Sequence, residues 1–300
     1  MKTKVLLNYI LLCIFWGTTW FAMKITLNYG TPPIFSAALR FVIGGCALWV
    51  LFWYKKETIP TNKVALSLYF QFAVLNFAIS YSLTYWATQY IYSNLSAILW
   101  AGFPFVVAVL SHWMLPKEPL TSKKLTSIGL GTIGVIIILT NSGSLGGENV
   151  SMGIFVVVLA VVIAAYPNVY LKKNYDVVSP ITLNAVSQSF AGIILLIVSF
   201  LTESRNDILW TAPNISAILY LSLIGSAVSW LIYFWLFSHI SMMQISYIAL
   251  FPPVIASIVG WIFLGEELNM FIILGALFVL GGAMIINLPG QKKIPEEIVH

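Results

Sequence analysis

The chain has 300 residues, of which 60% are hydrophobic and 8% are charged, and its mean hydropathy is +0.93. Soluble domains carry about 25% charged residues, so this composition excludes a water-soluble protein and indicates one that crosses a membrane several times. The formal net charge of +5 does not indicate a nucleic-acid partner, because a basic patch needs a soluble face to occupy.

Apolar runs follow one another along the whole chain. A bilayer core about 30 Å thick is crossed by about 20 apolar residues in a helix. Runs of roughly that length, separated by polar residues, proline or glycine, cover 5–27, 33–54, 64–88, 93–115, 122–140, 151–172, 180–201, 214–237, 243–264 and 270–287. We therefore predict an all-α integral membrane protein with ten transmembrane helices. No small-residue cleavage site follows the first run, so we expect an uncleaved first helix.

Lysine positions predict the orientation of these helices, because cytoplasmic loops carry an excess of Lys and Arg. Lysines flank alternate connections and both ends of the chain: Lys2, Lys4, Lys55, Lys56, Lys63, Lys117, Lys123, Lys124, Lys172, Lys173, Lys292 and Lys293. The opposite connections hold only Arg205. Both termini are therefore predicted to be cytoplasmic, and the protein is expected in the cell membrane.

The stretch 101–134 occurs twice, because the pattern A-x-F-P-x-V-x-A-x4-W-x4-E-x-L-x13-G recurs 148 positions further on, at 249–282. Self-similarity at a fixed offset indicates duplication. We predict a first five-helix repeat at 5–140, a linker at 141–150, a second repeat at 151–287 and a cytoplasmic tail at 288–300. Because five is odd, the two repeats cross the membrane in opposite senses, as in many secondary transporters.

Several motifs in these repeats resemble those of the EamA-like drug/metabolite transporters. They are Trp16-Gly17-Thr18, Pro33 with Arg40-Phe41, the run from Tyr85 to Tyr90, Phe103-Pro104 and Glu118-Pro119-Leu120, with Phe251-Pro252-Pro253 and Gly265 to Leu268 as second copies. The resemblance covers nearly the whole chain. It implies a ten-helix exporter of aromatic or neutral amino acids or similar metabolites, with a central cavity between the repeats.

Polar and aromatic residues inside the predicted helices are the candidates for lining that cavity, since aromatic walls with a few polar groups suit a small amphipathic ligand. They are Trp16, Thr19, Trp20, Arg40, Asn76, Ser80, Tyr81, Tyr85, Trp100, Tyr166, Asn168, Trp230, Tyr233 and Tyr247. Arg40 is the charge well inside a helix, and a substrate carboxylate could pair with it. The alternative is that Arg40 binds carbonyls of a neighbouring helix and stabilises packing.

No Asp or Glu lies deep in any predicted helix. Proton-coupled exporters of cations use buried ionisable groups as relays, so we predict facilitated export rather than cation/proton antiport. Glu118 and Glu266, at helix ends, are expected to interact with helix dipoles. Lys24, near the outer end of the first helix, is expected to extend towards water.

Three prolines interrupt predicted helices. Pro104, Pro167 and Pro252 remove backbone donors and can kink a helix. We interpret them as hinge points for gating, with a permanent kink that shapes packing as the alternative.

Other functions are less compatible with the sequence. A drug or nucleotide-sugar carrier of the same fold is an alternative function that the sequence leaves open. An integral-membrane enzyme would need a convergent catalytic or metal-ligating set, which the three scattered histidines and two cysteines do not supply. We therefore expect no enzyme activity, no cofactor and no metal. The expected partners are a small-molecule substrate and the lipid bilayer, and one chain is expected to suffice.

Overall fold

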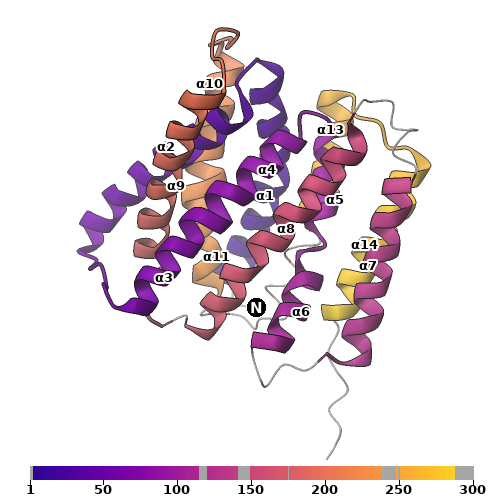
Figure 1. Cartoon of the computed structure of the whole chain (residues 1–300), viewed down its shortest axis with the longest axis horizontal. Helices are drawn as coiled ribbons and strands as arrows, with labels where there is room; N and C mark the ends of the chain where they lie inside the picture. Colours follow the sequence, from indigo (N-terminus) through magenta and orange to yellow (C-terminus); the bar gives the residue numbers. More distant parts are fainter. Residues whose placement is uncertain are drawn as a thin grey trace, which may run out of the picture.

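The computed structural model describes residues 3–114, 120–140, 149–174, 176–237, 239, 248 and 251–287. Its regular elements over these residues are all helical, which confirms the predicted class (Figure 1). Seven helical spans, some of them made of consecutive segments, are long and apolar enough to cross a membrane: Thr3–Asn28, Pro33–Lys55, Lys63–Ala87, Ser93–Met114, Val150–Lys173, Pro180–Thr202 and Ala212–Leu236. Two shorter apolar helices cover Phe251–Leu264 and Met270–Gly282. Ten membrane crossings therefore stay a prediction.

The first half of the described chain contains eight helical segments, of which η1 is a π-helix. They are α1 (Thr3–Asn28), α2 (Pro33–Lys55), α3 (Lys63–Gln71), η1 (Phe72–Ile79), α4 (Ser80–Ala87), α5 (Ser93–Trp100), α6 (Phe103–Met114) and α7 (Ser122–Thr140). Proline at the first position begins α2, and the side chain of Asn62 accepts a hydrogen bond from the Ala65 backbone N–H at the start of α3. These start signals are the usual ones for helices.

The second half repeats this order. Its segments are α8 (Val150–Lys173), α9 (Pro180–Thr202), α10 (Ala212–Leu219), the π-helix η3 (Tyr220–Val228), α11 (Ser229–Phe237), α13 (Phe251–Leu264) and α14 (Met270–Asn287). Ser179 caps α9 through its hydroxyl, and Asn269 caps α14 through its side-chain oxygen.

Both π-helices lie inside long helices for which the sequence predicts regular α-helix. Shifting Phe72–Ile79 by 148 positions gives 220–227, which falls on η3. The wider i→i+5 turn is rare and is common at functional sites. At the end of η3 a side chain follows the same wider spacing: the Ser229 hydroxyl donates to the carbonyl of Ile224, five residues earlier.

Pro104 does not kink a continuous helix, which corrects one expectation. The predicted helix 93–115 is interrupted by a turn at residues 101–102, and Pro104 is the second residue of α6. Proline is tolerated there because the first turn needs no backbone donor. Pro252 similarly lies in the first turn of α13, whereas Pro167 lies inside α8.

The helix contacts have the same pattern when the two halves are exchanged. α2 packs against α9 and α7 against α14, and each pair joins equivalent helices of the two halves. α1 contacts α13, as α8 contacts α6; likewise α8 contacts η1 and α4, as α1 contacts η3 and α11. Figure 1 shows α7 and α14 side by side at one edge of the bundle. This pattern supports the predicted duplication.

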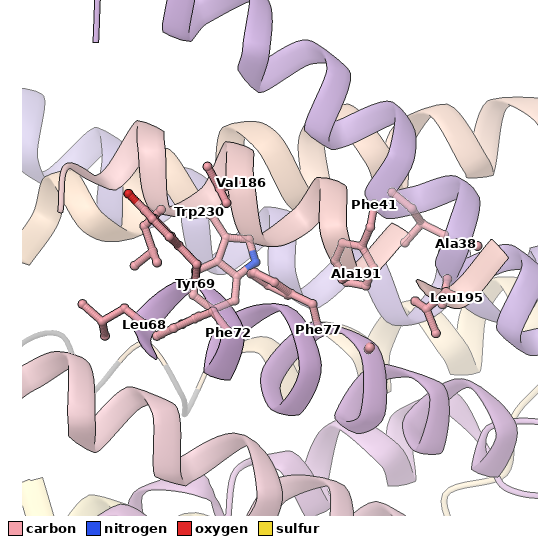
Figure 2. Close-up of a cluster of buried hydrophobic side chains, with 14 of the residues drawn as sticks. Ala38, Phe41, Leu68, Tyr69, Phe72, Phe77, Val186, Ala191, Leu195 and Trp230 are labelled. Carbon is pink, nitrogen blue, oxygen red and sulfur yellow. The ribbon is translucent and has the colours of Figure 1, made fainter. Parts of the chain in front are cut away.

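A large apolar core holds α2, η1, α9 and α11 together. Phe41, Phe72 and Phe77 are fully buried in it, and Trp230 packs edge-on against Phe77 at 5.4 Å (Figure 2). Aromatic pairs at such distances add to the free energy of burial. This core therefore packs beside the site described next.

Candidate functional site

A cavity of about 1580 Å³ lies between the two halves of the bundle. This volume exceeds the roughly 300–1,000 Å³ of ordinary small-molecule sites. Seven of the predicted site residues line it from α1, α2, η1, α4 and α5: Trp16, Thr19, Trp20, Arg40, Asn76, Tyr81 and Trp100. Asn168, Trp230 and Tyr233 line it from α8 and α11.

Charged side chains line the cavity at one end of the bundle. Lys4, Glu57, Lys124, Lys172 and Asp176 lie at the N-terminus or in and beside the lysine-rich connections that we predict to be cytoplasmic. We call this end of the bundle the inner end and the opposite one the outer end. Charged side chains thus line the cavity near the inner end.

Aromatic rings form a continuous wall in the middle of the cavity. Trp16 packs edge-on against Trp230 at 5.8 Å and lies 5.2 Å from Tyr233. On the other side Trp100 lies 6.4 Å from Tyr81 and 6.5 Å from Trp20. Flat rings of this kind can hold an apolar or aromatic solute by stacking.

Arg40 is the cation in this wall, with only 4% of its surface exposed. Its Nε donates to the Ser226 hydroxyl at 2.7 Å, and its Nη2 donates to the Gly225 carbonyl at 3.1 Å. A longer bond of 3.5 Å joins Nη1 to the Tyr85 hydroxyl, and the guanidinium carbon lies 4.9 Å from the Tyr81 ring. The π-helix η3 thus anchors the cation against the cavity.

Two asparagines form a second polar point in the lining. The Asn168 amide donates to the Asn76 side-chain oxygen at 3.1 Å and to the Ala164 carbonyl at 2.9 Å. Asn76 comes from η1 and Asn168 follows Pro167 in α8. An amide in an apolar wall needs a partner, and these two side chains provide one for each other while they line the cavity.

Side chains cross-link the helices at the outer end. Lys24 donates to the Thr88 carbonyl at 2.6 Å and to the Ile91 carbonyl at 3.2 Å. The expectation that Lys24 extends towards water is therefore wrong, because the carbonyls after α4 lie within its reach and accept hydrogen bonds from its ammonium group. Lys24 thus links α1 by hydrogen bonds to the connection between α4 and α5.

Glu266 adds a further cross-link at this end. Its carboxylate is 3% exposed and accepts from the backbone N–H of Ser93 at 2.6 Å and of Asn94 at 3.1 Å. It therefore stabilises the N-terminus of α5, in the other half of the chain, and not the adjacent helix that begins at Met270. Its charge also acts on Lys24. Glu118, its counterpart in the first repeat, lies outside the described residues.

Most of the other predicted site residues do not line the cavity. Ser80 is buried and donates to the Ala160 carbonyl, which joins α4 to α8, and Tyr85 is buried behind Arg40. Tyr166 is 40% exposed and stacks on Tyr170. The cavity is lined by Pro104 and Pro252 but not by Tyr166, Ser80, Tyr85 or Pro167. Tyr247 lies outside the described residues.

Sequence reasoning missed Ser226 and Gly225, which hold Arg40, and Met23 and Thr84, which line the cavity. Two adjacent small residues, Gly225 and Ser226, are the sequence signal that could have indicated a close approach of helices here. A Cβ at Gly225 would lie 2.6 Å from the Thr19 methyl carbon and 3.4 Å from Arg40 Nη2, so only glycine lets α1 and α2 approach η3 here.

A bundle of apolar helices around a large cavity between two similar halves has the architecture of a membrane carrier of small molecules. The EamA-like transporter family matches the chain twice, at residues 3–140 and 151–288. The chain belongs to this family, and it is a multi-pass protein of the cell membrane.

Its relatives are named as transporters. It is 27% identical to the uncharacterized transporter YoaV of Bacillus subtilis strain 168, over 93% of this chain and 95% of that protein. It is 26% identical to the S-adenosylmethionine/S-adenosylhomocysteine transporter of Chlamydia trachomatis serovar L2, over 90% and 85%. A solved crystal structure matches with a TM-score of 0.68 at 14% identity, over 95% and 97%, which shows the shared fold.

Proposed function

We propose that this protein is a secondary transporter that exports neutral or aromatic amino acids, or similar small metabolites, by alternating access. The observation that carries the proposal is the aromatic cavity with Arg40 and the Asn76–Asn168 pair in its wall. Such a wall suits a small solute with an apolar part and a few polar groups.

The proposed architecture is ten membrane crossings in two inverted repeats with cytoplasmic termini. The helix contacts support it, because they correspond when the two halves are exchanged, and so does the double match to the family. In this orientation the described conformation has a closed outer end and a cavity lined with charged groups towards the cytoplasm.

The duplication also suggests how the opposite conformation closes. The offset of 148 relates Lys24 to Lys172 and Glu266 to Glu118. In the described conformation Lys24 and Glu266 bond the helix termini at the outer end, and Lys172 lines the cavity near the inner end. We infer that Lys172 takes part in closing the inner end in the outward-open state, as a pseudo-twofold axis would require.

Facilitated transport is part of the proposal. Among the described lining residues the carboxylates are Glu57 and Asp176, near the mouth, whereas Glu266 is engaged with backbone N–H groups at the outer end. None of these stands beside Arg40 in the aromatic wall. A carboxylate relay in the middle of the path therefore has no candidate in the described lining.

Uptake into vesicles reconstituted with the purified protein tests both points. We expect labelled tryptophan, phenylalanine or threonine to enter at a rate that does not change when a pH gradient is imposed. Uptake driven by the gradient would contradict facilitated transport and retain the amino-acid substrate. No uptake of any of the three would contradict the amino-acid substrate.

A second candidate substrate is an adenosyl amino acid. The named S-adenosylmethionine/S-adenosylhomocysteine transporter among the relatives favours it, and so does a cavity of about 1580 Å³. Labelled S-adenosylhomocysteine belongs in the same uptake assay, where a rate above that of the free amino acids would select this candidate.

Pro104 and Pro252 provide a prediction about gating. Alanine at both positions would restore a backbone donor where α6 and α13 begin, and would let each helix extend towards the preceding residues. If a proline at the start of α6 and of α13 is needed for alternating access, we expect the double variant to lose most of its transport, by about tenfold or more, with substrate binding retained. Unchanged transport would contradict the gating role, and Pro167→Ala serves as the comparison inside a continuous helix.

A further inference from the structure

We propose that Arg40 makes the cavity selective for solutes that carry a carboxylate or a similar small anionic group, while the aromatic wall holds their apolar part. This inference rests on the proposed transport of small metabolites through the cavity. It assigns Arg40 to specificity and excludes solutes that bear only a positive charge.

The hydrogen bonds of Arg40 leave donors free for a ligand. A guanidinium has five N–H groups, and three bonds, to Ser226, Gly225 and Tyr85, are made from Nε, Nη2 and Nη1. Two N–H groups, one on each Nη, therefore have no partner within the described part of the chain. Arginine commonly binds a carboxylate through two parallel N–H···O hydrogen bonds.

The partners that Arg40 does have are uncharged. A hydroxyl, a carbonyl, a phenol and the face of Tyr81 surround it. Burying a cation without an anionic partner is costly. A solute carboxylate that entered the cavity would supply that anion, so binding energy is available to an anionic group and not to a cationic one.

Packing alone does not explain the charge. The duplication relates Arg40 to Gln188, which is fully buried in α9 at the equivalent place. The Gln188 amide donates to the Asn184 side-chain oxygen at 3.4 Å, and its own oxygen has no partner among the described residues. The fold thus tolerates a neutral, poorly bonded amide at this position, while the charged copy lines the cavity and Gln188 does not.

A second donor without a partner lines the same cavity. The indole N–H of Trp230 has no hydrogen-bond partner in the described residues, although its side chain is 7% exposed and lines the cavity. Trp230 is four residues after Ser226, which puts both on one face of the helix, and Figure 2 shows its ring against Phe77. The cavity lining thus offers an anionic group this N–H as well as the donors of Arg40.

The test compares three solutes of nearly equal shape with the wild-type protein. Phenylalanine is a zwitterion, 3-phenylpropionate is an anion, and phenylalanine amide, at a pH where its amine is protonated, is a cation without carboxylate. We expect the two carboxylates to bind about 10- to 100-fold more tightly than the amide, the range that hydrogen bonds to a charged group provide. Binding is measured by quenching of tryptophan fluorescence, and transport by vesicle uptake.

Variants assign the preference to Arg40. We expect Arg40→Gln to bring the affinity ratio of carboxylate to amide close to one, and Arg40→Lys to retain part of the preference because the charge remains. Gln188→Asn is the matched control, in which the ratio should not change. A merely structural role of Arg40 would lower all three affinities alike and leave the ratio intact.

The failures are distinguishable. Equal binding of the amide and the carboxylates by the wild-type protein would overturn the selectivity of Arg40 and leave the proposed function in place. Binding of none of the three would overturn the proposed amino-acid substrate and this inference together. If Arg40→Gln does not fold, as judged by its melting temperature, the wild-type comparison alone decides.

Discussion

Replacing Glu266 by alanine is expected to open the outer end of the cavity. The carboxylate accepts two backbone hydrogen bonds, from Ser93 and Asn94, and is almost fully buried. Alanine would leave both N–H groups at the start of α5 without an acceptor. Hydrogen bonds to charged groups contribute about 1.5–3 kcal/mol each, so a loss of about 3 kcal/mol would shift the ratio of closed to open outer end by about 100-fold.

Spin labels report this opening. Gln89, in the connection after α4, and Asn206, in the connection after α9, are exposed at the outer end. Cysteines at these two positions can be labelled once exposed Cys46 is replaced by alanine, because Cys13 is buried. We expect the distance between the labels to increase in Glu266→Ala.

The neighbouring residue provides the control. Glu267 is exposed, so Glu267→Ala removes the same charge from the same connection and should leave the distance unchanged. Glu266→Gln keeps one acceptor oxygen and should have an intermediate effect. If Glu266→Ala keeps the wild-type distance distribution, the carboxylate does not close the outer end.

Local chemistry explains why helix positions could be predicted. The predicted run 180–201 and the observed helix Pro180–Thr202 nearly coincide, because Ser179 and Pro180 are start signals and the apolar run is continuous. Such signals depend only on residues close in sequence. The paired π-helices carry no such signal, so regular α-helix was the natural expectation.

Lining residues were harder to predict because membrane helices are apolar on every side. A helix with one polar face reveals its inward side from sequence, but α8 has no such face. Asn168 therefore lines the cavity while Tyr166, two residues earlier, is exposed on another face.

Long-range bonds set the roles of the charged residues. Arg40 bonds Ser226, 186 positions later, and Glu266 bonds Ser93, 173 positions earlier. Neither partner can be identified from spacing along the chain. The sequence nevertheless singled out Arg40, since a cation inside an apolar run is rare and needs a reason.

Gly134 and Gly129 should respond in opposite directions when each is replaced by alanine. Both lie in α7, but a Cβ on Gly134 would lie 2.6 Å from the Gly275 carbonyl oxygen of α14, whereas a Cβ on Gly129 would have nothing within 4 Å. Backbone of a packed helix cannot move aside as a flexible side chain can. We therefore expect Gly134→Ala to destabilise the protein by about 1–3 kcal/mol, the usual cost of overpacking.

Gly129→Ala should instead stabilise the protein by up to about 1 kcal/mol, because alanine loses less conformational freedom in a helix. Thermal unfolding of both variants in the same detergent measures the two signs, with Gly275→Ala as a crowded position and Gly281→Ala as an open position in α14. A Cβ on Gly275 would lie 2.9 Å from the Gly134 carbonyl oxygen, and Gly281 has open space. Equal melting temperatures for Gly134→Ala and Gly129→Ala would mean that α7 and α14 do not pack backbone to backbone, and the pairing of equivalent helices across the two halves would lose its main support.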